Sequence, residues 1–265
     1  HHTDDIMCLR VNPSRDTAVS GQIGSKPTIF TWDACTGEKK QRIKIAKGAR
    51  GIKTVAINSQ GWICAADLHN EHQVYCFDQS GNNVFKEKGD TNIIYDCAWH
   101  PSENRFATAG KKHLYFWDAT KPGGEKKKGI FNGHEMCSFA SVAFDESGTC
   151  WSGGSNGKIY CWDDNRTCKD SFQVGKGFIC ALQYINGKLW AGGKDGKVNC
   201  IDTTTKQVEK CIEFGYGNII RAIDVDNNGN ILVGQRDGTI TCVDASGNKT
   251  NIMSSHSDGE VWGLA

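Results

Sequence analysis

Four side chains with the chemistry of an acid–base site occur close together in the middle of the chain. His134, Ser152, Asn156 and Trp162 supply an imidazole, a hydroxyl, an amide and an indole, and Glu135 follows the imidazole directly. A histidine beside a carboxylate can act as a general base. The motifs of catalytic serines, zinc proteases, phosphate-binding loops and dinucleotide-binding loops are absent from the sequence. The role of the four residues therefore depends on the elements that position them.

Those elements are short strands. Runs rich in β-branched and aromatic residues cover 141–144, 149–153 and 158–163, and a fourth run covers 171–174. The turns between the first three runs carry glycine, which tight hairpins need for positive φ. This stretch therefore predicts four consecutive antiparallel strands.

The same stretch recurs along the chain at intervals of 39 to 45 residues, measured at the aspartate that closes its third strand. That interval and three turn signals in each repeat are typical of WD-repeat blades. We therefore predict an all-β WD-repeat β-propeller. The dipeptides at the repeated position are Trp32-Asp33, Phe77-Asp78, Trp117-Asp118, Trp162-Asp163, Ile201-Asp202 and Val243-Asp244.

The repeat predicts a single domain, 1–265, with six complete four-stranded blades. Their approximate bounds are 2–45, 46–88, 89–131, 132–174, 175–214 and 215–254. The remaining stretch, 255–265, reads as the first strand of a seventh blade. An inner strand without neighbours would leave an unpaired edge, so we expect a piece of a seven-bladed ring in a longer protein. The alternative is a ring that closes with six blades, with the tail lying across the seam.

In WD blades a histidine, a serine or threonine, an aspartate or asparagine, and a tryptophan form a buried hydrogen-bond chain. We therefore predict that His134, Ser152, Asn156 and Trp162 form such a tetrad and have a structural role. No catalytic residue is predicted, and an enzyme is not expected. Parts of the tetrad or equivalent polar positions recur as His2, Ser20, Gln22, Trp32, Asp67, Asp195, Gln235 and Asp237.

Composition excludes several classes of partner. The 13 cysteines contain no C-x-x-C pair, and several directly precede the Trp-Asp position, so we predict buried free thiols and a reducing compartment, cytosolic or nuclear. The net charge of +1 and the lack of a long apolar run predict neither a nucleic-acid nor a membrane partner. The stretch 224–229 approaches a calcium loop but lacks its final glutamate, so no metal, cofactor or small-molecule substrate is predicted.

The two ends of the chain resemble one propeller family more specifically. The segment 2–13, with Gln22 and Trp32-Asp33, is similar to the first blade of the echinoderm microtubule-associated-protein-like family, and 256–265 resembles a segment repeated in that family. The resemblance implies a non-catalytic scaffold that binds tubulin or microtubules, in the cytoplasm on the cytoskeleton. Members also carry an upstream HELP motif, often a coiled coil, and a second propeller. A generic WD-repeat scaffold, such as a ubiquitin-ligase or ciliary adaptor, stays open.

Tubulin has acidic tails, so a nearly neutral propeller needs a local cationic patch to bind it. We expect one in a polar insertion, 120–128, between the third and fourth strands of the third blade. Its candidate contact residues are Lys121, Lys126, Lys127 and Lys128. A second basic run contains Lys39, Lys40, Arg42, Lys44 and Lys47. The alternative for each run is that its lysines only protect a strand edge from pairing with another chain.

Overall fold

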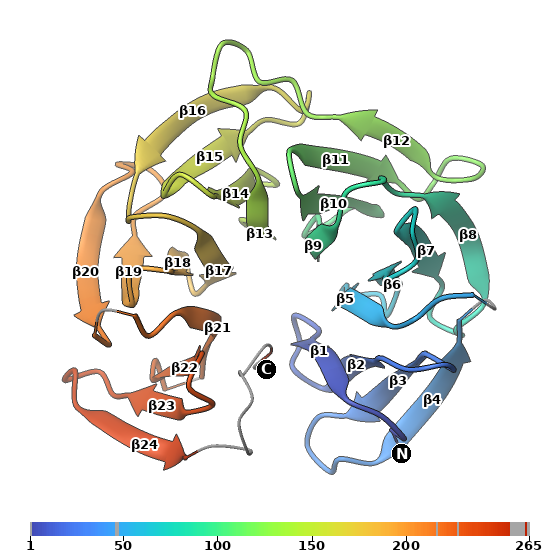
Figure 1. Cartoon of the computed structure of the whole chain (residues 1–265), viewed down its shortest axis with the longest axis horizontal. Helices are drawn as coiled ribbons and strands as arrows, with labels where there is room; N and C mark the ends of the chain where they lie inside the picture. The colour runs from blue at the N-terminus through green and yellow to red at the C-terminus, as the bar shows by residue number, and fades with distance from the viewer. Residues whose placement is uncertain (1, 46–47, 216, 227, 255–262, 264–265) are drawn as a thin grey trace. The chain divides into compact units, whose positions relative to one another are not determined.

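The structure is a computed structural model that describes residues 2–45, 48–215, 217–226, 228–254 and 263. All regular elements of these residues are β-strands, arranged as six four-stranded antiparallel sheets (Figure 1). Each sheet contains four consecutive strands, and we call the sheets blades one to six. The chain divides after Ile130 into two compact units, with blades one to three in the first and blades four to six in the second.

The first unit contains twelve strands, and the third blade ends in the shortest of them. Blade one consists of β1 (Ile6–Val11), β2 (Thr17–Gln22), β3 (Thr28–Asp33) and β4 (Lys39–Lys44). Blade two consists of β5 (Ile52–Ile57), β6 (Ile63–Asp67), β7 (Gln73–Phe77) and β8 (Asn83–Lys88). Blade three consists of β9 (Ile94–Trp99), β10 (Arg105–Gly110), β11 (His113–Asp118) and β12 (Glu125–Lys128).

The second unit repeats this order of strands. Blade four consists of β13 (Phe139–Phe144), β14 (Cys150–Gly154), β15 (Lys158–Trp162) and β16 (Cys168–Gln173). Blade five consists of β17 (Ile179–Ile185), β18 (Lys188–Gly193), β19 (Lys197–Ile201) and β20 (Val208–Glu213). Blade six consists of β21 (Ile220–Val225), β22 (Ile231–Gln235), β23 (Ile240–Val243) and β24 (Lys249–Met253).

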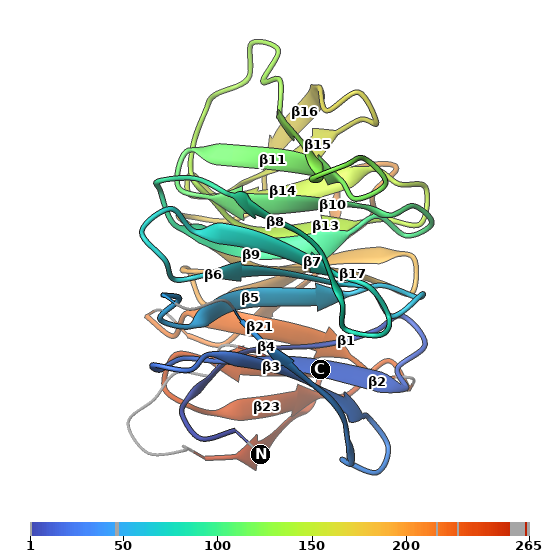
Figure 2. The ribbon, with the colours of Figure 1, turned by 90° about the vertical axis from the view of Figure 1, so that its right-hand side faces the viewer.

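The fourth strand is the most exposed strand of each blade. The second strand β6 is buried throughout, whereas β12 and β24 are exposed throughout. Within each unit the first strands of successive blades lie side by side, as β1, β5 and β9 do in Figure 2. The hydrophobic cores therefore lie between the faces of neighbouring sheets.

A glycine near the end of the second strand packs closely against an isoleucine of the next blade. A Cβ on Gly153 would lie 2.7 Å from Cγ2 of Ile179, and one on Gly192 would lie 2.4 Å from Cγ2 of Ile220. Neither glycine has a positive φ, so glycine is required here by close packing and not by the backbone conformation. A pair of small residues recurs at this position of the second strand, for example as Ser20-Gly21, Ser152-Gly153 and Ala191-Gly192. The contact with the isoleucine explains this small-residue pair.

The fourth strands are irregular. In five of the six blades the ladder between the third and fourth strands contains a register shift, and the exception is β11 with β12. Such bulges prevent an edge strand from pairing regularly with another chain. The extra residues in the fourth strands are Lys40, Val84, Lys169, Glu209 and Ile252.

The prediction of six four-stranded blades is confirmed, but the predicted insertion of the third blade is wrong. Residues 125–128 are not an irregular loop, because they form β12 and pair with β11 from Asp118 to Tyr115. An edge strand needs only backbone partners on one side, so four charged residues can form it. The predicted partial blade, 255–265, lies outside the described residues except for Gly263. That the whole chain is one domain stays a prediction.

Candidate interaction surface

The most complete polar relay lies in blade one rather than blade four. The imidazole of His2 has Nε2 2.6 Å from Oγ of Ser20 and Nδ1 2.8 Å from Oε1 of Gln22. The indole of Trp32 donates to the same Ser20 hydroxyl at 2.7 Å. Because the Gln22 oxygen can only accept, Nδ1 carries the proton, and the Ser20 hydroxyl donates to Nε2.

This relay has the components of a serine nucleophile with its base, but its burial prevents that chemistry. Ser20 is 2% exposed, and the indole N–H of Trp32 already occupies its oxygen. Burial also lowers the pKa of His2, so the imidazole is neutral near neutral pH. A nucleophile must reach its substrate. The relay therefore fixes the segment before β1 against β2 and β3.

Blade four contains only part of the predicted tetrad. Trp162 donates from Nε1 to Oγ of Ser152 at 2.9 Å, and both side chains are buried. His134, which precedes β13, instead contacts the outer strand β16, with Nδ1 3.0 Å from Oγ of Ser171. The structure therefore brings Ser152 and Trp162 together and places His134 in a separate contact.

The fourth predicted member, Asn156, also has other partners. Its amide donates to the hydroxyl of Tyr160 at 2.9 Å and to the carboxylate of Glu135 at 3.0 Å. Tyr160 occupies the position that Phe30 has in blade one, two residues before the tryptophan. Since phenylalanine offers no hydroxyl, this tyrosine provides a physical reason why the two blades differ.

Blade three contains a histidine that the sequence did not single out. His113 is 2% exposed, with Nδ1 3.8 Å from the carboxylate of Asp90 and 3.2 Å from the carbonyl oxygen of Lys111. Burial lowers the pKa of His113, and the charge of Asp90 opposes this shift. The hydroxyl of Tyr115 donates to Asp90 at 2.8 Å. In this blade the carboxylate and the tyrosine therefore neighbour the histidine, and a threonine, Thr108, accepts from the tryptophan indole at 2.9 Å.

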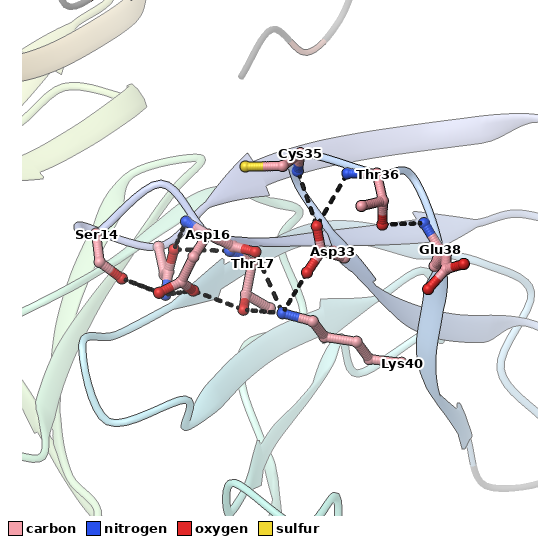
Figure 3. A network of polar contacts seen from close by, with 9 residues as sticks. Ser14, Asp16, Thr17, Asp33, Cys35, Thr36, Glu38 and Lys40 are labelled. Carbon is pink, nitrogen blue, oxygen red and sulfur yellow. Dashed lines mark hydrogen bonds and ion pairs between the residues drawn. The ribbon is translucent and has the colours of Figure 1, made fainter.

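The aspartate of each Trp-Asp dipeptide holds the turn that follows the third strand. In blade one Asp33 accepts backbone N–H bonds from Cys35 at 3.0 Å and Thr36 at 2.9 Å (Figure 3). These bonds lower the pKa of Asp33, although the group is only partly buried. The amine of Lys40 lies 3.4 Å from the Asp33 carboxylate and donates to Oγ1 of Thr17 at 3.0 Å. The repeated carboxylate therefore caps the turn, and in blade one it also forms an ion pair with Lys40.

Of the four lysines predicted to bind a partner, Lys126 is held most strongly by its own chain. Its amine donates to the carbonyl oxygens of Lys88 at 2.9 Å and Gly89 at 3.0 Å, at the end of blade two. It also lies 5.0 Å from the ring centre of Tyr115 and 5.5 Å from that of Trp117. Lys126 therefore links two blades.

The other three predicted contact lysines lie on or just before the same outer strand. Lys127 forms an ion pair of 2.8 Å with Glu125. Lys128 lies close enough to His113 for its charge to act on that imidazole. Lys121 lies in the turn before β12, where its charge helps to lower the pKa of Asp118, although hydrogen bonds from Thr120 contribute more. All four lysines are exposed at this edge.

The second basic run forms β4, except for Lys47, which lies outside the described residues. This strand carries four cations and no acid, whereas β16 and β20 carry acids together with their lysines. Cations of β4 lie near an aromatic ring, as Lys126 does. The Nζ of Lys39 and the guanidinium carbon of Arg42 are 6.0 Å and 5.9 Å from the ring centre of Phe30.

The remaining reactive groups of the described residues form no further site. Within the described ranges, no group of three or more histidine, cysteine or acidic side chains is placed to hold a metal ion. The cysteines are free thiols, and eight of them are buried. Burial raises the pKa of Cys8 and Cys76 to about 12, which keeps these thiols protonated. No helix of the described part of the chain is long and apolar enough to cross a membrane.

Comparison with known proteins connects these features to a family. A family model described as the first β-propeller of the echinoderm microtubule-associated protein matches residues 1–243. The ciliary WD repeat-containing protein ctxp80 of Euplotoides octocarinatus is 39% identical over all of this chain and 37% of its own length. Human echinoderm microtubule-associated protein-like 1 is 30% identical over all of this chain and 34% of its length. The chain thus spans about a third of these relatives.

Solved structures agree on the fold. The β-propeller domain of Myceliophteria thermophila Cps50 (Swd1) superimposes with a TM-score of 0.82, over 98% of this chain and 90% of that one. The two sequences are only 15% identical, so the similarity concerns the fold alone. Together with the six sheets, it confirms the predicted β-propeller.

Proposed function

The chain belongs to the family of the first β-propeller of echinoderm microtubule-associated proteins, and we propose that it is a non-catalytic scaffold that binds tubulin or microtubules. The match of the family model to residues 1–243 carries this proposal. The buried relay of blade one supports the non-catalytic part, because its serine is inaccessible. A place on the cytoplasmic cytoskeleton follows from the same proposal.

Cations at the outer strands of the first unit are the proposed contact with acidic tubulin tails. Lys121, Lys127 and Lys128 of the third blade stay in this proposal. Lys126 is the least suitable of the predicted lysines, because two carbonyl oxygens and two rings already surround its amine. Exposed charge contacts are weak and screened by salt over about 8–10 Å, so binding through them depends on ionic strength.

A ciliary scaffold is the second candidate, because a 39% identical relative is named as a ciliary protein. The two candidates differ in the partner that the protein needs. A scaffold with a different ciliary partner would not bind purified tubulin, whereas a microtubule-associated propeller would.

Co-sedimentation with microtubules assembled from purified tubulin tests the proposal. We expect the protein to pellet at low salt and to be released as the salt concentration rises. Lys121, Lys127 and Lys128 changed together to glutamate should weaken pelleting, while Lys126 is kept to preserve the contact between blades. Absence of pelleting at low salt would refute the tubulin proposal and favour the second candidate. Equal pelleting of both proteins would exclude these three lysines as the contact.

A further inference from the structure

Blade five carries two lysines without an acidic partner on its loops. Lys176 lies in the connection from blade four, and Lys194 begins the turn between β18 and β19. Both residues are exposed, and neither amine forms a hydrogen bond or an ion pair with a described residue. Blades four and six flank blade five within the same compact unit (Figure 1). The surroundings of both lysines are therefore set within this unit.

Most other lysines of the unit have partners. An acidic side chain lies within ion-pair distance of Lys158, Lys169, Lys188, Lys197 and Lys206. Lys249 donates to the backbone oxygen of Glu213. Lys210 also lacks an acidic partner among the described residues, but it lies on the outer strand β20 and is partly buried. Lys176 and Lys194 are thus the unpaired lysines that occur together.

Backbone contacts bring the two lysines together. The backbone N–H of Lys194 donates to the carbonyl oxygen of Phe178 at 2.9 Å. The side chain of Lys194 covers Gly177, where a Cβ would lie 3.5 Å from Cδ of the lysine. The carboxylate of Asp195 accepts the backbone N–H of Lys176 at 3.0 Å. This neighbouring acid therefore holds the loop and leaves both amines unpaired.

The opposite loop edge of the unit is acidic. It contains the turns from first to second and from third to fourth strands. The described residues of these turns include seven acids, Asp145, Glu146, Asp163, Asp164, Asp202, Asp226 and Asp244, and two cations, Arg166 and Lys206. The described loops of the other edge, from Val174 onwards, include two acids, Asp195 and Asp237, and three cations, Lys176, Lys194 and Arg236.

The acids of the first edge are ionised. The backbone N–H of Thr205 donates to Asp202 at 2.7 Å, and this bond, with the amine of Lys188, lowers the pKa of Asp202 to about 2. An acidic partner is therefore repelled by this edge and approaches the edge with Lys176 and Lys194 more easily.

We propose that the loops of blade five bind an acidic peptide segment, whose carboxylates pair with Lys176 and Lys194. The inference rests on the proposed function and makes it more specific, because it adds a contact for acidic tails in the second unit. Carboxylates of the partner supply the acids that the fold itself provides for other lysines of this unit. Exposed ion pairs are weak and screened by salt, so this contact depends on ionic strength.

The probe is a fluorescent peptide of glutamate and glycine, and its binding is followed by anisotropy at low salt. Lys176 and Lys194 changed together to glutamine should raise the Kd by about fivefold, because two exposed ion pairs are lost. The matched control changes Lys169 and Lys210 to glutamine, which removes the same charge from outer strands of the same unit, and should change the Kd by less than about twofold. The same peptide with glutamine in place of glutamate should not bind.

Carbodiimide cross-linking tests the site without any substitution. The reagent joins a peptide carboxylate to a lysine amine and takes up the water that is released, and mass spectrometry of the digested protein locates the new amide bond. Lys176 and Lys194 should be cross-linked more often than Lys169 and Lys210. Equal cross-linking of the four lysines would overturn the proposal, even if the double variant does not fold.

Equal losses of peptide binding in both double variants would show that only the overall charge matters, and would also overturn the proposal, as would an unsubstituted protein that does not bind the peptide. Microtubule pelleting without peptide binding would remove this inference and leave the proposed function intact. Peptide binding through Lys176 and Lys194 without pelleting would keep the site and remove the tubulin proposal.

Discussion

Replacing Gly153 with alanine tests how neighbouring blades interlock. The added Cβ would lie 2.5 Å from Oγ of Ser141 and 2.7 Å from Cγ2 of Ile179. Both neighbours are buried, and the Ser141 hydroxyl donates to the Ile179 backbone oxygen at 2.9 Å. Neither side chain can move away without disturbing the contact between blades four and five.

The expected cost follows from two opposing effects. Carbon atoms pack at about 3.5–4.0 Å, so the new methyl group is about 1 Å too close to Ile179. Overpacking of this kind costs about 1–3 kcal/mol. Alanine also restricts the unfolded chain, which stabilises the folded state by about 0.4–1 kcal/mol. We therefore expect Gly153→Ala to lower the free energy of unfolding by about 1–2 kcal/mol.

Denaturant unfolding of a double-mutant cycle isolates the contact. Ile179→Ala alone should cost about 2–5 kcal/mol, because it leaves a cavity in a buried core. In the double variant the new methyl group occupies part of that cavity. The cost of the pair should therefore be about 1 kcal/mol smaller than the sum of the single costs. Full additivity, or a Gly153→Ala protein as stable as the parent, would refute this account of the small-residue pair.

Three further outcomes are expected. Thr108→Val removes the acceptor of the buried Trp117 indole and should cost about 1–3 kcal/mol in denaturant unfolding, with little change in side-chain volume. Burial lowers the folded-state pKa of His113, so the unfolded chain binds more protons than the folded one below the ordinary histidine pKa of about 6.5. The stability that His113 contributes is therefore retained above that pH and lost as the pH falls below it. His113→Gln should flatten this pH dependence of the free energy of unfolding, and an unchanged slope would contradict the explanation. Lys126→Met should cost about 1 kcal/mol through two lost hydrogen bonds, and Lys127→Met, the control, less than about 0.5 kcal/mol; equal costs would show that Lys126 does not link the blades.

The strands could be predicted because their signals are local. Glycine turns and alternating apolar residues define each hairpin, and the repeat confirms the register several times along one chain. The strand β12 could not be recognised in this way. Its four residues are all charged, and an edge strand that is exposed on both faces leaves no hydrophobic pattern. Only its pairing with β11 makes it a strand.

The polar site was predictable only where a strand ladder positions its residues. Ser152 and Trp162 lie on adjacent strands of one hairpin, so the ladder brings them together. His134 precedes the first strand of its blade and is not part of any ladder, so the repeat alone cannot fix its partner. The hydroxyl of Tyr160, which binds Asn156, is a difference of one atom from the phenylalanine of blade one. A repeat pattern does not distinguish tyrosine from phenylalanine at such a position.

The bulged fourth strands have a consequence for crowding. A scaffold that collects on a polymer or in a large complex experiences local concentrations in the millimolar range, far above its average in solution. At such densities, regular exposed edges would join copies into continuous sheets. Five outer strands carry an extra residue, and the sixth ends in three consecutive lysines. Neighbouring copies can therefore lie close together on a shared support without their edge strands pairing.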